Sequence, residues 1–532
     1  MGGLGAMSGL PSHMRYGFVI DHRKCIGCHA CTVACKEENQ VPLGTFRTWV
    51  KYVEKGAWPH TRRYFSVLRC NHCDDAPCVT ICPTVALYRR PDGIVDLDGA
   101  RCIGCKSCMQ GCPYDALYID PNTNTAAKCH YCAHRLEVGL EPACVIVCPE
   151  RAIVAGDLDD ARTEIARLVA REQVEVRKPE QGTRPKVYYV GADSSALSPS
   201  LQRPAATYLW GQRPAGEADL VGMVAALQED AHAALARPVY DAPHVPRPWG
   251  AKVSAYLWTK SIAAGALLVA AVSGSSWWGT TLSITAPAIS LLFVLLTTAL
   301  LVVDLKRPER FLYILFKPNW RSWLVWGAWI LIAFGAAAGA WLTAGLAGHY
   351  PPDAVRLPVA LLALATAGYS ALLFGQAEGR DFWQSPLVLP HLVVAAIVAG
   401  SAALLVASLA WPGTLAAADG APHPAVRVDD VLVPLLFLAI AAHGALILCE
   451  VLSRHPVRDA ALAARLLTRG AYRARFWAGV VVGGTLAPLG ALSAAVIADS
   501  TALTVVGALL ALAGLWLWED LWVKAGQTVA LS

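Results

Sequence analysis

The sequence predicts a protein of two parts, an α+β domain rich in cysteine followed by an all-α bundle of eight transmembrane helices. Three observations indicate this division. The 532 residues are too many for one ordinary soluble domain. Sixteen of the 17 cysteines lie between Cys25 and Cys148, and the last is Cys449. The first 250 residues are mixed and polar, whereas the chain from about residue 253 onward consists mostly of Ala, Leu, Val and Trp.

The cysteines of the first part form four groups of four. The groups at 25–35 and 102–112 share the pattern C-x2-C-x2-C-x3-C. The group at 70–82 reads C-x2-C-x4-C-x3-C, and the group at 129–148 has a longer loop in its middle. Three close cysteines followed by a fourth is the spacing of bacterial iron–sulfur proteins, in which the fourth cysteine reaches a neighbouring cluster.

Disulfide bonds and zinc are the alternative uses of these cysteines. We find no secretory signal peptide, which disfavours a disulfide framework. Zinc sites are built from pairs of cysteines, whereas a triplet plus one recurs here four times. The spacing therefore favours iron–sulfur clusters.

Residues 15–190 resemble the four-cluster electron-transfer subunits of molybdopterin oxidoreductases, such as those of dimethyl sulfoxide reductase and formate dehydrogenase. The resemblance covers the four cysteine groups and the segment AIVAGD at 152–157. It implies a tandem ferredoxin-like fold with four [4Fe–4S] clusters. Some members of this family replace the middle cysteine of the third group and hold a three-iron cluster, but Cys105 is present here. The implied ligand sets pair the first group with the fourth and the second with the third: Cys25, Cys28, Cys31 and Cys148; Cys35, Cys129, Cys132 and Cys144; Cys70, Cys73, Cys78 and Cys112; and Cys82, Cys102, Cys105 and Cys108.

Few regular elements are expected around the cysteine loops. Residues 46–70 alternate apolar and polar side chains, which favours a hairpin. Residues 157–173 open with acidic residues and carry apolar positions at helical spacing, so we expect a surface helix. We expect a flexible N-terminus over 1–14 before the cluster domain at 15–190. The many prolines that follow predict an extended linker over 191–250.

The second part, residues 251–532, contains enough apolar stretches for eight membrane spans. A spanning helix needs about 20 apolar residues. Tryptophans lie near several predicted ends, as interfacial aromatic residues do. The expected spans lie near 254–276, 281–303, 322–346, 356–376, 387–410, 431–452, 475–498 and 501–523.

Basic residues are divided unequally between the two sets of loops. The loops at 304–321, 377–386 and 453–475 lie on the side of both termini and hold twelve Lys or Arg. The opposite loops hold Arg356 and Arg427. The positive-inside rule therefore predicts an inner (cytoplasmic) membrane protein whose iron–sulfur domain and termini face the cytoplasm. We find no twin-arginine export signal, which agrees with this orientation.

The second part also resembles a known family, the polysulfide-reductase-type membrane subunits that exchange electrons with quinone. The matching segments are SAYLWTKSIAAG (254–265), DLKRPERF (304–311), FGQAEGRDFW (374–383) and WVKAGQ (522–527). The resemblance implies a quinone-binding membrane domain, with menaquinone as the expected quinone. Because both parts belong to one chain, we expect them to work together.

Polar side chains within the expected spans are candidates for the quinone site, because such groups are unfavourable in lipid and usually mark function. We expect Asp304 and His391 to supply protons to the quinone. The other candidates for the pocket are Tyr256, Lys260, Gln376, Glu378, His443 and Glu450. The alternative for Lys260, Glu378 and Glu450 is that they only extend to the interface.

A bis-histidine haem is the main alternative cofactor of the membrane part. His391 and His443 are the only histidines within the expected spans, and their depths differ by roughly 6 residues, about 9 Å of helix rise. Because two axial ligands must lie at similar depth, we expect no haem.

Three functions fit these features. The first is an electron-transfer and membrane-anchor subunit of a respiratory molybdopterin oxidoreductase, which exchanges electrons with quinone. The others are a scaffold with structural clusters, which four clusters in line disfavour, and a redox-driven ion-translocating subunit. No molybdopterin domain is visible, so we expect a separate catalytic subunit. Formate is its expected substrate, with hydrogen or a sulfur or nitrogen oxide as alternatives. No basic, aromatic-rich patch indicates nucleic acid as a partner.

Overall fold

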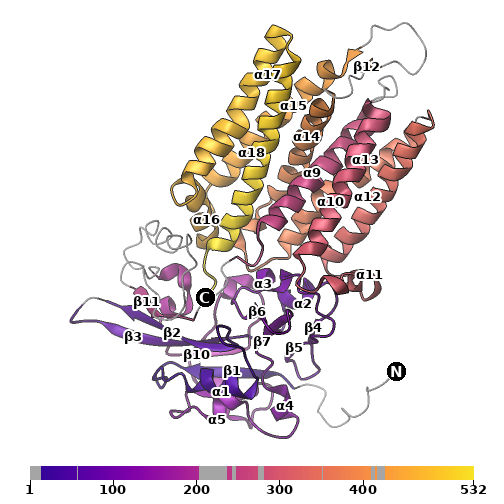
Figure 1. The fold of residues 1–532 in the computed structure, drawn as a ribbon. Helices are drawn as coiled ribbons and strands as arrows, with labels where there is room; N and C mark the ends of the chain where they lie inside the picture. The colour runs from indigo at the N-terminus through magenta and orange to yellow at the C-terminus, as the bar shows by residue number, and fades with distance from the viewer. Residues whose placement is uncertain are drawn as a thin grey trace.

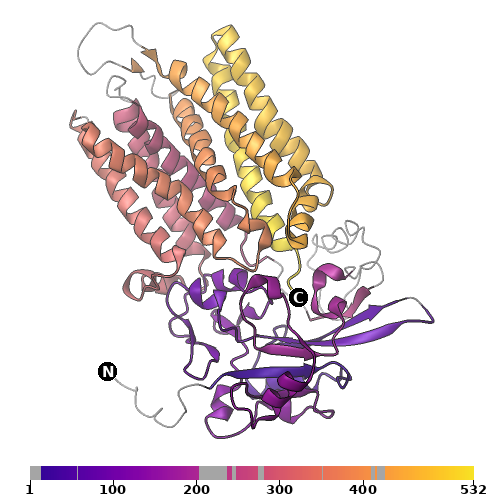
Figure 2. The same ribbon diagram turned by 180° about the vertical axis from the view of Figure 1, so that it is seen from behind.

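The computed structural model of the chain consists of a cysteine-rich part and a bundle of long helices, stacked end to end (Figure 1). The cysteine-rich part lies across one end of the bundle, as the view from behind also shows (Figure 2). This confirms the predicted fold class. The structure describes residues 14–56, 58–202, 236–242, 247–273, 281–349, 351–408, 414–415 and 426–532. The predicted flexible N-terminus lies outside them, except for its last residue.

A four-stranded sheet forms the base of the cysteine-rich part. Its central strand β1 (Tyr16–Asp21) pairs antiparallel with β8 (Ile153–Asp157) and parallel with β10 (Val187–Val190), and β10 pairs with β9 (Val174–Glu175). The inward side chains of β1, such as Phe18, are fully buried. The sheet therefore brings the start of the chain, the end of the cysteine region and residues beyond 186 into one fold.

Two short hairpins repeat after the second and third cysteine groups, as expected for a tandem fold. β4 (Leu87–Arg89) pairs with β5 (Val95–Leu97), and β6 (Leu117–Ile119) pairs with β7 (Ala126–Lys128). The cysteines lie in the loops and short helices between these strands. Those helices are α1 (Ala30–Glu38), α2 (Pro77–Thr80), α3 (Ser107–Gly111), α4 (Ala133–Leu136) and α5 (Ala143–Ile146).

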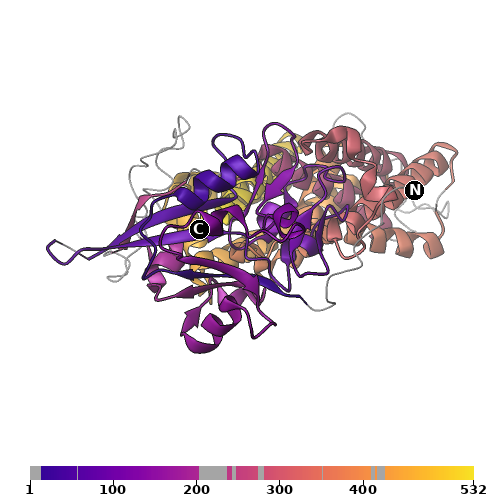
Figure 3. The ribbon, with the colours of Figure 1, turned by 90° about the horizontal axis from the view of Figure 1, so that it is seen from below.

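The hairpin predicted over 46–70 is confirmed. β2 (Thr48–Lys55) and β3 (Arg62–Arg69) pair antiparallel along their whole length. The hairpin projects sideways beyond the body of the molecule (Figure 3). β11 (Ala236–Tyr240) adds a third strand to it.

The surface helix predicted over 157–173 is shorter than expected. Helix α6 spans Glu164–Arg171, because residues up to Asp157 continue strand β8. Thr163 caps the helix, its Oγ1 accepting a hydrogen bond from the Ala166 N–H.

The predicted linker over 191–250 lies partly within the described residues. Its described residues pack against the cysteine-rich part, as helix α7 (Ser194–Leu197), a short 3-10 turn (Pro199–Leu201) and strand β11. Leu197 is buried in the core beside Phe18 and Tyr189. Residues 203–235 and 243–246 lie outside the described part of the chain.

Eight helices of the second part are long and apolar enough to cross a membrane, counted over the described residues. This confirms the predicted number of spans. They are α9 (Ala251–Val272), a π-turn with α10 (Thr281–Asp304), α12 (Trp323–Leu346), α13 (Asp353–Gly375), α14 (Val388–Ala407), α15 (Val428–Leu452), a π-helical segment with α17 (Arg475–Ala498), and α18 (Thr501–Thr528).

Helix α9 lies at the centre of this bundle. In the apolar stretch of α9, 83% of the residues are buried inside the protein. The corresponding share is 28% in the span that contains α10 and also 28% in α12. It contacts α10, α13, α14 and α18. Gly265 of α9 and Gly400 of α14 let the two backbones touch, since a Cβ on Gly400 would lie 2.1 Å from the Gly265 carbonyl carbon. The polar side chains of α9 therefore face protein and not lipid.

Shorter elements complete the chain. Most lie where the two parts meet: α11 (Tyr313–Phe316), α16 (Arg458–Thr468), and the 3-10 turns Pro308–Arg310 and Asp381–Gln384. A further 3-10 turn (Pro179–Gln181) belongs to the cysteine-rich part. At the far end of the bundle β12 (Thr414–Leu415) pairs with β13 (Val426–Arg427).

Candidate functional site

The structure gathers the sixteen cysteines into four quartets. One hollow, with about 340 Å³ of space free of protein atoms, is lined by Cys25, Cys28, Cys31 and Cys148. A second, with about 270 Å³, is lined by Cys35, Cys129, Cys132 and Cys144. The other two quartets are Cys70, Cys73, Cys78 and Cys112, and Cys82, Cys102, Cys105 and Cys108, in which each thiol interacts with others of its set. These are the sets that the family resemblance implied.

Two glycines shape corresponding cysteine loops. Gly27 in the first group and Gly104 in the third both have a positive φ, of 73° and 68°. A Cβ on Gly27 would lie 2.4 Å from the ring of Phe65, and a Cβ on Gly104 would lie 2.5 Å from Lys306. Both loops therefore need glycine, for conformation and for space.

Backbone N–H groups orient several sulfurs. The N–H of Ala152 donates to the Sγ of Cys148 at 3.2 Å, and that of Ala126 donates to the Sγ of Cys102 at 3.4 Å. Such hydrogen bonds favour the thiolate, which is the form that binds iron.

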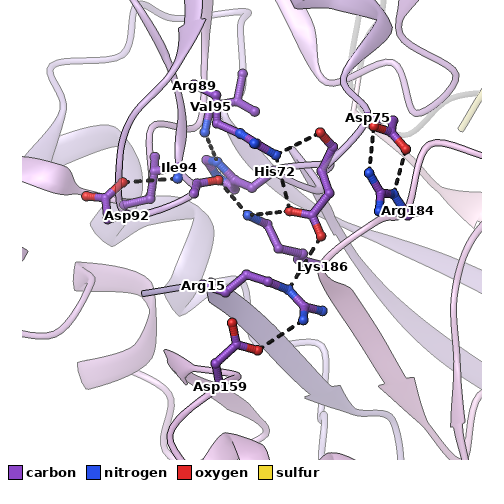
Figure 4. A network of polar contacts seen from close by, with 12 residues as sticks. Arg15, His72, Asp75, Arg89, Asp92, Ile94, Val95, Asp159, Arg184 and Lys186 are labelled. Carbon is purple, nitrogen blue, oxygen red and sulfur yellow. Dashed lines mark hydrogen bonds and ion pairs between the residues drawn. The ribbon is translucent and has the colours of Figure 1, made fainter. Parts of the chain in front are cut away.

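A network of ion pairs anchors the loop of the second cysteine group to the base sheet (Figure 4). Asp74 follows Cys73 and lies within 3.4 Å of both Arg15, just before β1, and Lys186, just before β10. Neighbouring Asp75 pairs with Arg184. The quartet that contains Cys73 is thereby fixed to the strands that carry the ends of the domain.

The chemistry of the quartets fits iron–sulfur clusters. All 17 cysteines lie in the described ranges and none forms a disulfide. Burial raises the pKa of the Cys31 and Cys129 thiols to about 12, so their thiolates need a strongly positive partner. No three His, Cys, Asp or Glu side chains of the described residues are arranged to hold a single metal ion. Four sulfurs around a larger space suit a cluster of several metal atoms.

The quartets form a row that ends at the membrane part. Thiols of adjacent quartets interact at each step, in the pairs Cys31 with Cys144, Cys129 with Cys70, and Cys78 with Cys108. The quartet of Cys82, Cys102, Cys105 and Cys108 is therefore last, and the one containing Cys28 is first.

Hydrogen bonds attach this last quartet to the membrane helices. Trp249, just before α9, donates from Nε1 to the Cys105 carbonyl at 3.2 Å. Asn319 donates to the Cys82 carbonyl at 2.7 Å, and Arg310 donates to the Cys102 carbonyl at 3.0 Å. The row of cysteines and the membrane bundle are thus in direct contact.

Lys260 is completely buried in the centre of the bundle. Its Nζ donates to the Ala367 carbonyl at 2.8 Å and the Ser370 hydroxyl at 2.9 Å, and lies 4.9 Å from the centre of the Tyr369 ring. The alternative that Lys260 extends to the interface is therefore wrong. Tyr256, also predicted for the pocket, is buried one turn earlier on α9.

Sequence reasoning missed Glu519 of α18. It is buried close to Lys260 and Ser261. The rule that singled out Lys260 would have found it, because an acid inside a predicted span is unfavourable in lipid.

His391 and His443 lie side by side, with ring centres 4.5 Å apart. The Nε2 of His391 accepts a hydrogen bond from the Trp518 indole. The Nδ1 of His391 and the Nε2 of His443 have no partner within the described residues. The predicted difference in depth between the two histidines is wrong. It therefore no longer argues against a bis-histidine haem. It assumed that the start of α14 and the end of α15 lie at the same depth.

Glu450 of α15 lies closer than the two histidines to the end of the bundle that meets the cysteine-rich part. Its Oε1 accepts a hydrogen bond from the Trp522 indole at 3.3 Å, and its Oε2 has no partner in the described part of the chain. The alternative that Glu450 extends to the interface does not fit its burial, at 2% exposed. Since Trp518 and Trp522 are one turn apart on α18, Glu450 and the two histidines belong to the same polar cluster.

Three candidates for the quinone pocket lie where the two parts of the chain meet, apart from the cluster of His391, His443 and Glu450. They are Asp304, Gln376 and Glu378. Asp304 pairs with Lys106, between Cys105 and Cys108, at 2.8 Å, and no contact joins it to His391 in the described structure. Gln376 accepts from the Trp323 N–H and so caps α12. Glu378 lines an open hollow with Asp75; burial first, and Asp75 second, raise the pKa of its carboxyl.

Comparison with known families matches both parts of the chain. A family described as "Polysulphide reductase, NrfD" matches residues 241–530, and one described as "4Fe-4S dicluster domain" matches residues 61–158. The first match covers more than half of the chain. The chain therefore belongs to the polysulphide reductase NrfD family and carries a 4Fe–4S domain before its membrane part.

The cysteine-rich part is similar to subunits of several reductases. It is 46% identical over 206 residues to a subunit of the tetrathionate reductase of Salmonella typhimurium, which covers 38% of this chain and 82% of the relative. It is 40% identical over 181 residues to a subunit of the polysulfide reductase of Wolinella succinogenes, covering 33% and 94%. The thiosulfate reductase electron transfer subunit of Salmonella typhi is 45% identical over 163 residues, covering 30% and 84%.

The Lys106–Asp304 ion pair gives a test of how Asp304 acts. We expect Asp304→Asn and Lys106→Gln each to lower the thermal midpoint of the detergent-solubilised protein, and the double variant to lower it no further. A shared contact predicts a coupling of about 0.5–3 kcal/mol in this cycle. The exposed pair Arg162–Asp160 is the control, and Arg162→Gln should leave the midpoint unchanged. Additive effects of the two junction variants would contradict the role of Asp304 as an interdomain contact.

Proposed function

We propose that this chain is the electron-transfer and membrane-anchor subunit of a molybdopterin oxidoreductase complex, passing electrons between a separate catalytic subunit and membrane quinone. The observation that carries this proposal is the row of cysteine quartets ending on the membrane bundle. Membership of the NrfD family and the similarity to electron-transfer subunits of reductases support it. A scaffold would need neither a continuous row nor its contact with the membrane part.

We propose that the four quartets hold four [4Fe–4S] clusters, which supply one-electron transfer when bound. The sixteen cysteines are the proposed ligands, in the sets that the structure brings together. The chain's own contribution is to hold adjacent sets in contact, to bury them, and to orient their sulfurs with N–H donors.

The first quartet is the proposed place of contact with the catalytic subunit. Cys28 is exposed there, at the end of the row farthest from the membrane. Large apolar side chains around it are also exposed, namely Ile26, Val33, Ile146 and Val147. Exposed apolar groups around an exposed redox ligand favour a protein partner that covers them.

We propose the cluster of His391, His443 and Glu450 as the site where quinone is bound and protonated. Reduction of a quinone takes two electrons and two protons. The unpartnered Nδ1 of His391, Nε2 of His443 and Oε2 of Glu450 offer hydrogen bonds to carbonyl oxygens and a route for protons. The predicted use of menaquinone is part of this proposal.

Lys260 and Glu519 support a second candidate function. They are a buried base and a buried acid in the middle of the bundle, beside Tyr256. Buried ionisable groups in a membrane are found in proton pathways. Redox-driven proton movement through this pair is therefore the alternative that the structure favours most.

For the catalytic partner we propose an enzyme acting on a sulfur compound. The relatives described above are named for tetrathionate, polysulfide and thiosulfate. These names favour a sulfur substrate over the formate expected from the sequence, which stays an untested prediction.

We propose that the cysteine-rich part faces the cytoplasm from the inner membrane. Basic side chains gather at the end of the bundle that meets this part, as in the loop containing Arg307, Arg310 and Lys317. The positive-inside rule places that end on the cytoplasmic side.

Iron analysis tests the proposed clusters. We expect about sixteen iron atoms per purified chain, four for each quartet. Cys105→Ser should lower the iron content, whereas Cys449→Ser should not, because Cys449 lies on α15 outside the quartets. A wild-type content near eight, or zinc in place of iron, would overturn this assignment.

Protease protection tests the orientation. Protease added to inside-out membrane vesicles should remove residues 1–250, because the positive-inside rule exposes them on the cytoplasmic face. In right-side-out spheroplasts the same residues should be protected. The reverse pattern would place the cysteine-rich part outside.

Substitution of the histidines tests the quinone site. We expect His391→Ala and His443→Ala to slow quinone reduction by about 100-fold, since general acid–base groups contribute this much. The clusters should remain assembled and reducible, as followed by spectroscopy in the same preparation. His349→Ala is the control, because His349 is exposed beyond the end of α12. Unchanged turnover in both variants would place the quinone elsewhere.

A further inference from the structure

Arg69 is a buried cation in direct contact with a cysteine sulfur. It ends strand β3, immediately before Cys70, and is 1% exposed. Its Nη1 donates to the Sγ of Cys144 at 3.1 Å, and its guanidinium lies 4.4 Å from the centre of the Phe18 ring. The strand and the ring therefore hold the charge in one place.

Among the residues that the structure describes, no carboxylate compensates this charge. The Nε and Nη2 atoms of Arg69 have no hydrogen-bond partner within the described residues, and no ion pair of Arg69 is found there. The groups beside it that become negative, on losing a proton, are the thiols of Cys144, Cys129 and Cys31. An unpaired charge is buried only at a large free-energy cost, several kcal/mol for each ion. The negative charge that balances Arg69 must therefore come from the cysteine quartets.

These three cysteines place Arg69 between two quartets. Cys129 and Cys144 belong to the second quartet of the row, and Cys31 belongs to the first. A guanidinium at this position is close to both sets of sulfurs. Its charge cannot be removed by deprotonation at any physiological pH, so it is permanent.

We propose that Arg69 is a positioning residue that raises the reduction potentials of the first two clusters by stabilising their reduced forms. The inference rests on the proposed function, because it needs clusters in these quartets. On reduction one electron arrives from the donor, no bond forms or breaks, and the quartet gains one negative charge. A fixed positive charge in a poorly polarisable interior stabilises that added charge.

The other buried basic residues within the described part of the chain do not donate to a cysteine sulfur. Lys128 lies near Cys129 of the second quartet but donates to the carbonyls of Val95 and Cys129. Arg177 is equally buried, and it donates to the carbonyls of Leu197 at 3.2 Å and Leu531 at 2.9 Å. Arg177 is therefore a matched control, a buried guanidinium without a sulfur partner.

The test is a redox titration of the purified full chain in detergent, with dithionite as reductant and electron paramagnetic resonance as readout. We expect Arg69→Gln to lower the equilibrium constant for reduction of one or two clusters at least tenfold, a shift of about 59 mV to lower potential. Arg69→Lys keeps the charge and should shift them less. Arg177→Gln should leave all four potentials unchanged.

Iron content separates the possible outcomes. Wild-type protein without four clusters would overturn the proposed function itself, whatever Arg69 does. With four clusters present, unchanged potentials in Arg69→Gln, or equal shifts in Arg69→Gln and Arg69→Lys, would overturn the role of its charge. Loss of iron in both variants would also overturn it, because Arg69 would then be needed for assembly. Loss of iron in Arg69→Gln alone would overturn it as well, because the charge would then be needed to assemble the clusters and not to set their potentials.

Discussion

The attachment of the last cysteine quartet to the ends of the membrane helices determines where every other functional group lies. Carbonyls of Cys82, Cys102 and Cys105 accept hydrogen bonds from side chains of the membrane part. Backbone carbonyls buried at such a junction need partners, and here the loop after α10 and the residues before α9 supply them. The row of quartets is thereby held against one end of the bundle. The polar cluster around His391 lies within the bundle, toward that end.

Charge is arranged differently in the two parts. In the cysteine-rich part, Arg15 and Lys186 pair with Asp74, whereas Arg69 and Lys128 lie beside a sulfur and backbone carbonyls. In the bundle, ionisable groups gather in two places, around Lys260 and around His391. Both places share α18, since Glu519 lies near the first and Trp518 contacts the second. Adjacent residues of one helix therefore connect two buried polar clusters.

Sequence reasoning predicted what depends on local pattern. The hairpin and the eight spans follow from periodicity, whereas the sets of cysteines that come together were implied by the family resemblance. Sequence reasoning failed where the position of one helix relative to another determines which side chains meet. The depth of His391 was counted from the start of its span and that of His443 from the end of the next span, yet the rings lie side by side because these two helix ends are not at equal depth. Asp304 ends a span and so resembled a proton donor, but its partner Lys106 comes from a distant loop, which no local pattern reveals.

Having both parts on one polypeptide changes the physics of their junction. In a complex of separate subunits, such a contact dissociates on dilution, and its strength sets how often it is complete. Here Trp249 and Cys105 are joined by the same polypeptide, so the contact forms at an effective concentration in the millimolar range or above. Weak hydrogen bonds are then sufficient to keep it closed. The ratio of cysteine rows to membrane bundles is fixed at one to one, however unequally partner subunits are produced.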